Sequence, residues 1–214
     1  SIDDILPRKR VELLNSEPQN KNCVLITGAG GSIGSEISRQ LFSMKLSKII
    51  LFDICEFNLF SINKELNDLL EEGKSLPKDK RNKAKVIPIL GDINDARRLK
   101  QILSKYKVDT VYHAAAYKHV PMVEFSENIL YSIHNNIFGT LTVMQSCIEE
   151  NVKSAILVST DKAVRPTNIM GATKRFAEQL VQSLQENNKS IRLSMVRFGN
   201  CLLYTSPSPR DFQV

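Results

Sequence analysis

No apolar run in this sequence approaches the roughly 20 residues that a membrane-spanning helix needs. The longest runs, such as residues 49–52 and 155–158, have the length of a buried strand. No signal peptide opens the chain, and its composition, with 42% hydrophobic and 24% charged residues, is that of an ordinary folded protein. We therefore expect the 214 residues to form one soluble domain with a sizeable core, or one domain and part of another.

Cysteine and histidine are scarce, and neither is grouped. The four cysteines include no Cys-x-x-Cys pair, so no disulfide framework is implied and a reduced, cytoplasmic setting is expected. The three histidines lack the spacing of a metal site and have no cysteine or carboxylate cluster beside them, which predicts ordinary structural histidines and no metal. These residues are Cys23, Cys55, Cys147 and Cys201, and His113, His119 and His134.

The formal net charge is +6, and one local basic run lies at residues 78–85. No aromatic residue is interleaved with this run, and it falls between two expected elements. This favours a solvated loop, and we expect no nucleic-acid partner. A modest positive field would suit an anionic nucleotide substrate or an acidic membrane surface.

The stretch CVLITGAGGSIG at residues 23–34 predicts a strand, a tight turn and the start of a helix. Its glycines let the backbone approach a pyrophosphate, while the helix offers free N–H groups and the positive end of its dipole. A P-loop is excluded, because no Gly-Lys-Ser/Thr closes the turn. The expected cofactor contacts here are Thr27, Gly28, Gly31, Ser32, Ile33 and Gly34.

A second buried strand is expected at residues 48–53, and it ends in Asp53, 19 residues after Gly34. This is close to the roughly 20 residues typical of a dinucleotide-binding unit. A carboxylate there would bind the ribose diol and repel a 2′-phosphate, which favours NAD over NADP. The alternative is a glycine turn in any α/β protein, but strand, glycines, helix and acid occurring in this order favour the dinucleotide site.

Strands alternate with helices along the rest of the chain, which predicts a Rossmann-type, doubly wound parallel sheet of strand order 3-2-1-4-5-6 with ligands at its carboxyl edge. Asn94 is expected to cap the third long helix. Residues 1–22 are read as an N-terminal arm and residues 23–200 as the NAD(P)-binding domain, so that the substrate domain is largely missing. Further strands are expected at 86–90, 108–113, 153–159 and 191–198, with a long helix over 126–151.

Two segments are expected where these strands end. Asp92 and Ile93 follow the third strand, at the edge where an adenine binds. Ala114, Ala115 and Ala116 follow the fourth strand, and their small side chains would leave room for a cofactor pressed against the strand end. Close packing of a helix explains the three alanines equally well.

The fifth strand ends in Ser-Thr-Asp-Lys, and the next helix brings a second lysine to the same edge. Lys174 could bind the nicotinamide ribose and lower the pKa of neighbouring donors. Thr160 could hydrogen-bond a sugar hydroxyl during its oxidation, Asp161 could act as a general acid, and Lys162 could act as a base if burial depresses its pKa. The alternative, a helix cap formed by Asp161 beside solvated lysines, is equally compatible with this tetrapeptide.

Several strings resemble the extended short-chain dehydrogenase/reductases of nucleotide-sugar metabolism, and more narrowly the UDP-N-acetylglucosamine 4,6-dehydratase family of bacterial polysaccharide biosynthesis and protein glycosylation. The lead-in at residues 4–8 also resembles the large members, whose transmembrane region precedes the catalytic part; we expect that anchor to be absent from these 214 residues. The other strings are TGAGGSIGSE at 27–36, the segment 50–57, HAAAYKHVPMVE at 113–124, STDKAVRPTNIMGATKR at 159–175 and MVRFGN at 195–200.

The resemblance implies an internal redox dehydration of a UDP-sugar. NAD takes a hydride from sugar C4, the ketone acidifies C5–H, water leaves across C5 and C6, and the same hydride returns to C6. A full-length protein would work at the cytoplasmic face of the inner membrane, and a homo-oligomer is compatible with the family. The implied active group is Thr160, Asp161, Lys162 and Lys174, with Lys118, Asn136, Arg197 and Asn200 holding cofactor or substrate. A structural role explains Asn136 and Arg197 equally well.

Two departures from the family pattern affect this interpretation. Most short-chain dehydrogenases have Tyr-x-x-x-Lys, whereas Met170 stands four residues before Lys174, as in the large membrane-type dehydratases. The string CLLYTSPSPRD at 201–211 matches a translated transposase adapter, which predicts a non-native tail over 201–214 and a truncated enzyme. The alternatives are a nucleotide-sugar 4-epimerase, disfavoured by the missing tyrosine, and a non-catalytic dinucleotide-binding fragment.

Overall fold

The computed structural model describes residues 22–44, 46–75 and 82–199. Several predictions fall outside these ranges: the N-terminal arm apart from Asn22, the middle of the basic run, the Asn200 contact and the tail over 201–214. Within the ranges, every helix is too short or too polar to cross a membrane.

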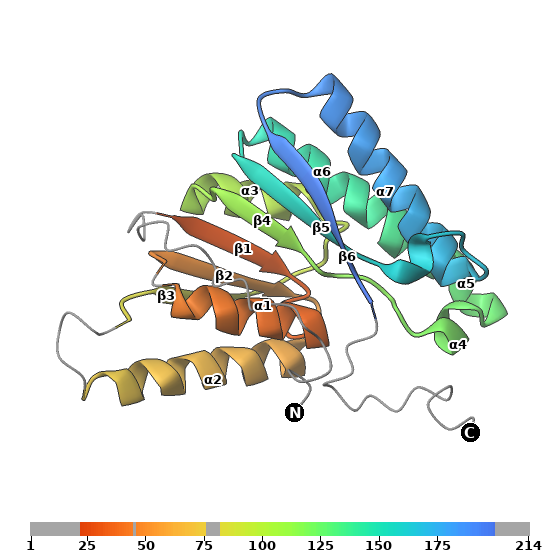
Figure 1. Cartoon of the computed structure of the whole chain (residues 1–214). Helices are drawn as coiled ribbons and strands as arrows, with labels where there is room; N and C mark the ends of the chain where they lie inside the picture. The colour runs from red at the N-terminus through yellow and green to blue at the C-terminus, as the bar shows by residue number, and fades with distance from the viewer. Residues whose placement is uncertain (1–21, 45, 76–81, 200–214) are drawn as a thin grey trace, which may run out of the picture.

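Six parallel strands form one sheet in the order β3-β2-β1-β4-β5-β6, which confirms the predicted Rossmann-type topology (Figure 1). The strands are β1 (Cys23–Thr27), β2 (Lys48–Asp53), β3 (Lys85–Leu90), β4 (Thr110–His113), β5 (Ser154–Thr160) and β6 (Arg192–Phe198). The α-helices are α1 (Ser32–Ser43), α2 (Glu56–Gly73), α3 (Ala96–Tyr106), α4 (Val120–Val123), α5 (Ser126–Ile133), α6 (Gly139–Glu149) and α7 (Ile169–Asn187).

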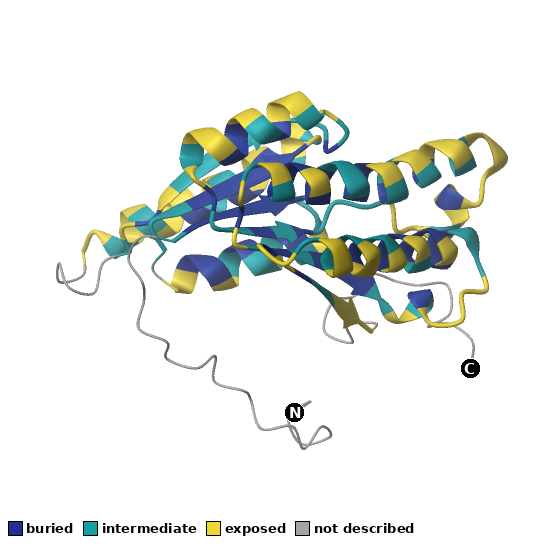
Figure 2. Cartoon of the chain, turned by 90° about the horizontal axis from the view of Figure 1, so that it is seen from above, coloured by how far each residue is buried: buried dark blue, intermediate teal, exposed yellow. Residues whose placement is uncertain are grey.

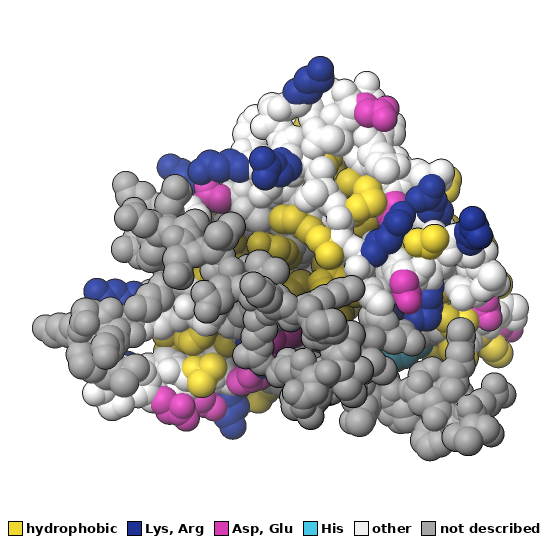
Figure 3. Space-filling model, in the orientation of Figure 1, with side chains coloured by type: hydrophobic (Ala, Val, Ile, Leu, Met, Phe, Trp, Pro, Cys, Tyr) yellow, Lys and Arg dark blue, Asp and Glu magenta, His cyan; other side chains and the backbone are white. Residues whose placement is uncertain are grey.

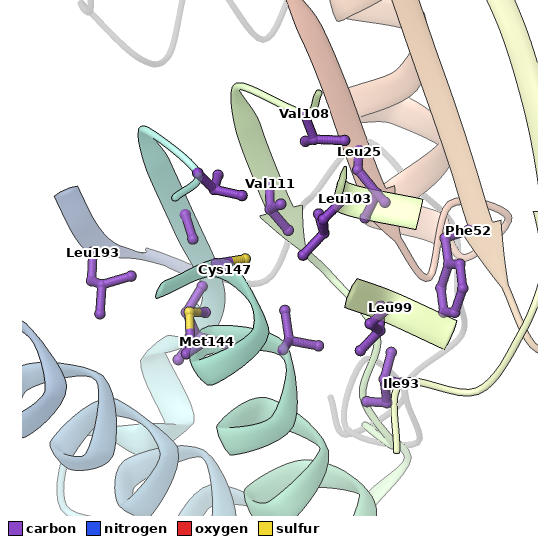
Figure 4. Close-up of a cluster of buried hydrophobic side chains, with 14 of the residues drawn as sticks. Leu25, Phe52, Ile93, Leu99, Leu103, Val108, Val111, Met144, Cys147 and Leu193 are labelled. Atoms are coloured by element: carbon purple, nitrogen blue, oxygen red, sulfur yellow. The ribbon is translucent and has the colours of Figure 1, made fainter. Parts of the chain in front are cut away.

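Helices cover both faces of the sheet, as the alternation of strands and helices predicts (Figures 1 and 2). One face packs against α1 and α2, and its core includes Ile26, Leu51 and Leu66. The opposite face packs against α3, α6 and α7. Figure 4 shows how this second core brings side chains of α3, α6 and the strands together, with Leu103, Val111, Met144, Cys147 and Leu193 among those labelled.

The face of the sheet that packs against α1 and α2 is covered unevenly. Helices α1 and α2 pack on β1, β2 and β3, and hydrophobic side chains are visible over the β5–β6 end of the sheet (Figure 3). Val196 and Phe198 of β6 are 44% and 41% exposed. Within the described ranges, this end of the sheet therefore presents partly exposed apolar side chains to its surroundings.

Two local predictions were wrong in detail. Asp95, rather than Asn94, caps α3, because its carboxylate accepts a hydrogen bond from the backbone N–H of Arg98. The helix expected over 126–151 is interrupted by a π-helical turn, η2 (His134–Phe138), between α5 and α6. The side chain of Asn136 in this turn bonds groups outside the helix, which only the folded chain places within reach.

A buried carboxylate joins α7 to β5 and β6. Glu178 is fully buried and accepts hydrogen bonds from Arg197 of β6 at 2.7 and 2.8 Å. Ser159 of β5 donates to it at 2.7 Å and Arg175 at 3.2 Å. Burial raises the pKa of Glu178, but these hydrogen bonds outweigh burial, so its pKa lies below the usual range. The carboxylate is therefore held in its charged form.

Replacing Gly34 with alanine is expected to destabilise the fold by about 3 kcal/mol, because a Cβ there would lie 1.9 Å from the backbone oxygen of Gly28. The matched control is Gly73→Ala at the end of α2. Nothing lies within 4 Å of a Cβ at Gly73, so this variant should gain about 0.5–1 kcal/mol. Urea unfolding measures both changes, and equal effects of the two substitutions would contradict the close contact.

Glu178→Gln is expected to cost about 1–3 kcal/mol at pH 7, because it removes charge-assisted hydrogen bonds from a buried site. Since the folded pKa of Glu178 is lowered, its contribution is present above the unfolded value of about 4.3 and is lost as the pH falls through the folded pKa. The difference between wild type and variant in denaturant midpoint should therefore shrink on acidification. The exposed Glu186→Gln on the same helix is the control; a pH-independent difference would refute the assignment.

Candidate functional site

A groove of about 230 Å³ opens at the carboxyl ends of β1, β2 and β4. This is the edge at which parallel sheets of this topology bind ligands. The groove brings together most of the residues that the sequence predicted for a cofactor: Gly28, Gly31, Asp53, Asp92, Ile93, Ala114, Ala115 and Ala116. It is also lined by residues that the sequence analysis missed, namely Phe52, Ile54, Asn58, Gly91, Tyr117 and Asn135.

The glycine turn lies in contact with the end of β4. Gly28 has a φ of +64°, and a Cβ there would lie 2.7 Å from the backbone of Ala115. The N–H of Gly31 donates to the carbonyl of Gly28 at 3.0 Å, which tightens the turn. Only glycine combines this backbone conformation with so close an approach, so the turn is a narrow backbone cradle beside the groove.

Helix α1 begins at this turn with its amide dipoles directed toward the groove. Its N-cap is Gly31, which contributes no side-chain cap, and Ser32 is exposed at the first helical position. The amine of Lys118 donates to the hydroxyl of Ser32 at 3.1 Å. Lys118 was expected to contact cofactor or substrate, and the structure places it at the helix N-terminus. A cation and a helix dipole together make this turn suited to an anion.

Asp53 is fixed at the end of β2 by two backbone donors. Its Oδ2 accepts from Gly30 N at 2.8 Å, and its Oδ1 accepts from Cys55 N at 2.9 Å. Each carboxylate oxygen retains capacity for a further hydrogen bond, and the side chain lines the groove. The predicted acid therefore stands beside the glycine turn, in a fixed orientation suited to a diol.

The far side of the groove follows β3. Asp92 accepts two hydrogen bonds from Asn94 through its Oδ1, one from the backbone and one from the side chain, both at 2.8 Å. Gly91 precedes it, and a Cβ there would lie 2.6 Å from the ring of Phe52. The Gly-Asp pair after the third strand was the available sequence signal for Gly91. No local pattern points to Tyr117 or Asn135.

Several predicted residues do not line the groove. Thr27 is fully buried, and its hydroxyl lies 2.7 Å from the ring of His113. Asn136 is buried and uses its amide on Tyr117 and Thr173. Arg197 pairs with Glu178. For Asn136 and Arg197, the structure therefore supports the structural alternative.

The Thr160-Asp161-Lys162 segment forms a short 3₁₀ turn, η3 (Asp161–Ala163), where β5 ends. Thr160 caps this turn and also donates to Asp161 at 3.0 Å, while the amine of Lys162 lies 3.8 Å from the same carboxylate oxygen. The suggested cap by Asp161 is therefore wrong: Thr160 caps η3, and Asn168 caps α7. The side chain of Asp161 is 56% exposed and accessible to a ligand.

Lys174 is the buried amine of this region, whereas the side chain of Lys162 is 29% exposed. The Nζ of Lys174 donates to the backbone carbonyl of Val158 at 3.1 Å, two residues before the end of β5. Burial lowers the pKa of Lys174 to about 8, and the neighbouring Glu178 opposes that shift. An amine with this pKa can exchange a proton near neutral pH. Met170, one turn earlier, is buried and has no titratable group.

Among the described residues, His, Cys, Asp and Glu side chains form no group of three or more that could hold a metal ion. The groove and the group formed by Thr160, Asp161, Lys162 and Lys174 offer backbone amides, carboxylates and amines. These groups suit a phosphate-containing ligand with hydroxyl groups.

The chain resembles known proteins along most of its length. It is 42% identical over 205 residues to the capsular polysaccharide biosynthesis protein CapD of Staphylococcus aureus, covering 94% of this chain and 32% of that protein. It is 35% identical over 184 residues to an inverting UDP-N-acetylglucosamine 4,6-dehydratase of Campylobacter jejuni, covering 85% of this chain and 49% of the dehydratase. The chain thus spans a third to a half of the length of these relatives.

A solved structure shares this fold over most of the chain. The X-ray structure of Pen from Bacillus thuringiensis superposes with a TM-score of 0.71 at 30% identity, covering 86% of this chain and 52% of that one. The family described as "Polysaccharide biosynthesis protein" matches residues 24–206. The chain therefore belongs to this polysaccharide biosynthesis protein family, within the extended short-chain dehydrogenase/reductase superfamily.

Proposed function

We propose that this chain is the cofactor-binding part of an NAD-dependent enzyme that dehydrates a UDP-N-acetylhexosamine, UDP-N-acetylglucosamine in the first instance, to its 4-keto-6-deoxy form. One observation supports this most strongly. The glycine-turn groove and the group formed by Thr160, Asp161, Lys162 and Lys174 belong to one carboxyl edge of one sheet. The similarity to an inverting 4,6-dehydratase supports the choice of reaction.

The residues present suit a dinucleotide. The Gly28 turn and the uncapped start of α1 offer backbone amides to a pyrophosphate, and Lys118 adds a positive charge beside them. Asp53 offers carboxylate oxygens to a ribose diol and would repel a 2′-phosphate, which supports NAD over NADP. When bound, NAD supplies a hydride acceptor that later returns the hydride.

The polar groups at the end of β5 have complementary roles in this proposal. Thr160 orients a sugar hydroxyl, and the exposed carboxyl of Asp161 donates a proton to the departing C6 hydroxyl. Lys162 remains the proposed base at C5. Lys174, whose pKa burial lowers to about 8, would hold the nicotinamide ribose and relay the proton that Met170 cannot take.

Two other functions predict different behaviour. A 4-epimerase would interconvert C4 epimers, and Met170 in the position of the usual tyrosine disfavours it. A non-catalytic dinucleotide-binding module would bind NAD without turnover.

The proposed setting is the cytoplasm, at the inner face of the membrane for a full-length protein. The thiols of Cys23 and Cys147 support a reduced environment, because both are free and buried. Burial raises the pKa of Cys23 to about 11 and that of Cys147 to about 12, so both stay protonated and unreactive.

Turnover of UDP-N-acetylglucosamine with added NAD tests the proposed function. We would compare the chain with a version extended by the carboxyl-terminal part of the CapD relative. We expect the extended protein to form the 4-keto-6-deoxy product, and Asp161→Asn to lower its kcat by about 100-fold or more, because the general acid is lost. Asp68→Asn, on the exposed side of α2, is the matched control and should leave kcat unchanged.

The outcomes separate the candidates. An extended, folded and NAD-loaded protein that leaves the sugar nucleotide unchanged would refute the dehydratase proposal for this substrate. Interconversion of C4 epimers would support the epimerase instead. Full activity of the Asp161→Asn variant would remove the proposed acid while leaving the reaction class in place.

A further inference from the structure

A buried histidine on β4 lies between two threonines from different elements. The Nδ1 atom of His113 lies 2.7 Å from the hydroxyl oxygen of Thr27, the last residue of β1. Its Nε2 atom lies 3.0 Å from the hydroxyl oxygen of Thr140 in α6. All three side chains are 2% exposed or less. The imidazole therefore joins three elements in the interior, next to the groove and outside it.

The surrounding bonds determine which ring nitrogen carries the proton. The hydroxyl of Thr140 donates its one proton to the backbone carbonyl of Asn136 at 2.7 Å. Its oxygen can therefore only accept from His113, so Nε2 must be the protonated nitrogen. A neutral imidazole then has an acceptor at Nδ1, to which Thr27 donates. The oxygen of Thr27 in turn accepts the N–H of Ala115 at 3.4 Å.

The environment keeps the ring neutral. Burial, together with the smaller effect of the nearby positive charge of Lys174, lowers the pKa of His113 to about 3. The direction of every hydrogen bond from Ala115 to Asn136 is therefore the same at any pH at which the protein works.

The two ends of this hydrogen-bond chain reach different parts of the candidate site. At one end, Ala115 lines the groove and contacts the backbone of Gly28. At the other end, the backbone carbonyl of Asn136 accepts from Thr140. The side-chain amide of Asn136 donates to Thr173 at 3.1 Å, one residue before Lys174 in α7. The same amide donates to the carbonyl of Tyr117 at 3.0 Å. The ring of His113 lies at the centre of this connection between the cofactor groove and the lysine helix.

We propose that His113 is a positioning residue: as the neutral Nε2–H tautomer it holds residues 114–116 against the glycine turn through Thr27, and it places the Lys174 helix through Thr140 and Asn136. For the ligand of the groove, this inference rests on the proposed function. The hydrogen-bond arrangement itself stands on the geometry of this chain alone.

Long-range ¹H–¹⁵N spectra of the 214-residue chain test the arrangement directly. The sequence contains three histidines, and the exposed His119 and His134 are internal references. We expect His113 to show a protonated Nε2 and an unprotonated Nδ1, unchanged between about pH 5 and pH 8. A protonated Nδ1, a charged ring or a mixture of tautomers would overturn the proposal. This measurement needs neither cofactor nor variant.

Two substitutions at His113 separate the contributions of the two ends of the hydrogen-bond chain. His113→Asn keeps an acceptor near the position of Nδ1, and His113→Gln keeps a donor near that of Nε2, so each loses one hydrogen bond. We expect His113→Gln to weaken NAD binding about tenfold per folded molecule and to shift the amide resonance of Ala115. His113→Asn should keep NAD affinity within about twofold and shift the amide of Thr173 instead. His134→Gln is the control on an exposed histidine.

The outcomes distinguish this proposal from the proposed function. Equal NAD affinities and equal amide shifts for the two variants, with similar losses in Tm, would show a purely structural histidine. If the wild-type chain binds no NAD, the proposed function fails, and the tautomer and the amide shifts of Ala115 and Thr173 still decide the role of His113.

Discussion

The contact between the glycine turn and the segment after β4 is the constraint on which the rest of the site depends. Gly28 adopts a left-handed conformation against the backbone of Ala115, and Gly34 packs against Gly28 at the start of α1. This approach brings the helix dipole, the end of β2 and the alanine segment to one groove. Asp53 adds a second restraint, because it accepts the N–H of Gly30 across the sheet edge. Any larger residue at these glycines would separate the groove walls.

In the half of the sheet formed by β5 and β6, a buried charged residue joins the strands to their helix. Glu178 joins α7 to β5 and β6, and its negative charge lies near Lys174, whose amine would otherwise lose its proton more readily. The network thus has two effects: it fixes the helix that carries the lysine, and it raises the pKa of that lysine against the lowering effect of burial. The carboxylate of Glu178 thus affects both the position of α7 and the protonation of Lys174.

Much of the fold followed from local patterns. Some features can be recognised from residues close together in the sequence: short buried runs such as residues 49–52, the glycine spacing and the acid at 53. These local patterns predicted the strand order and most of the groove. The pairing of Thr27 with His113 spans 86 residues, and no local pattern encodes it. The π turn at Asn136 depends on partners across the fold. The boundaries at residues 22 and 200 stay predictions.

The central claim is that the groove binds NAD, and a titration of the chain with NAD followed on its backbone amide resonances tests it most directly. We predict saturable shifts at Gly31, Ser32 and Asp53, and weaker binding of NADP because of Asp53. The amide resonances of Lys107 and Asn151 should not shift, because these residues line a polar hollow at the amino ends of β4 and β5. Shifts at those two residues instead, or no saturable shift in the groove, would contradict the account.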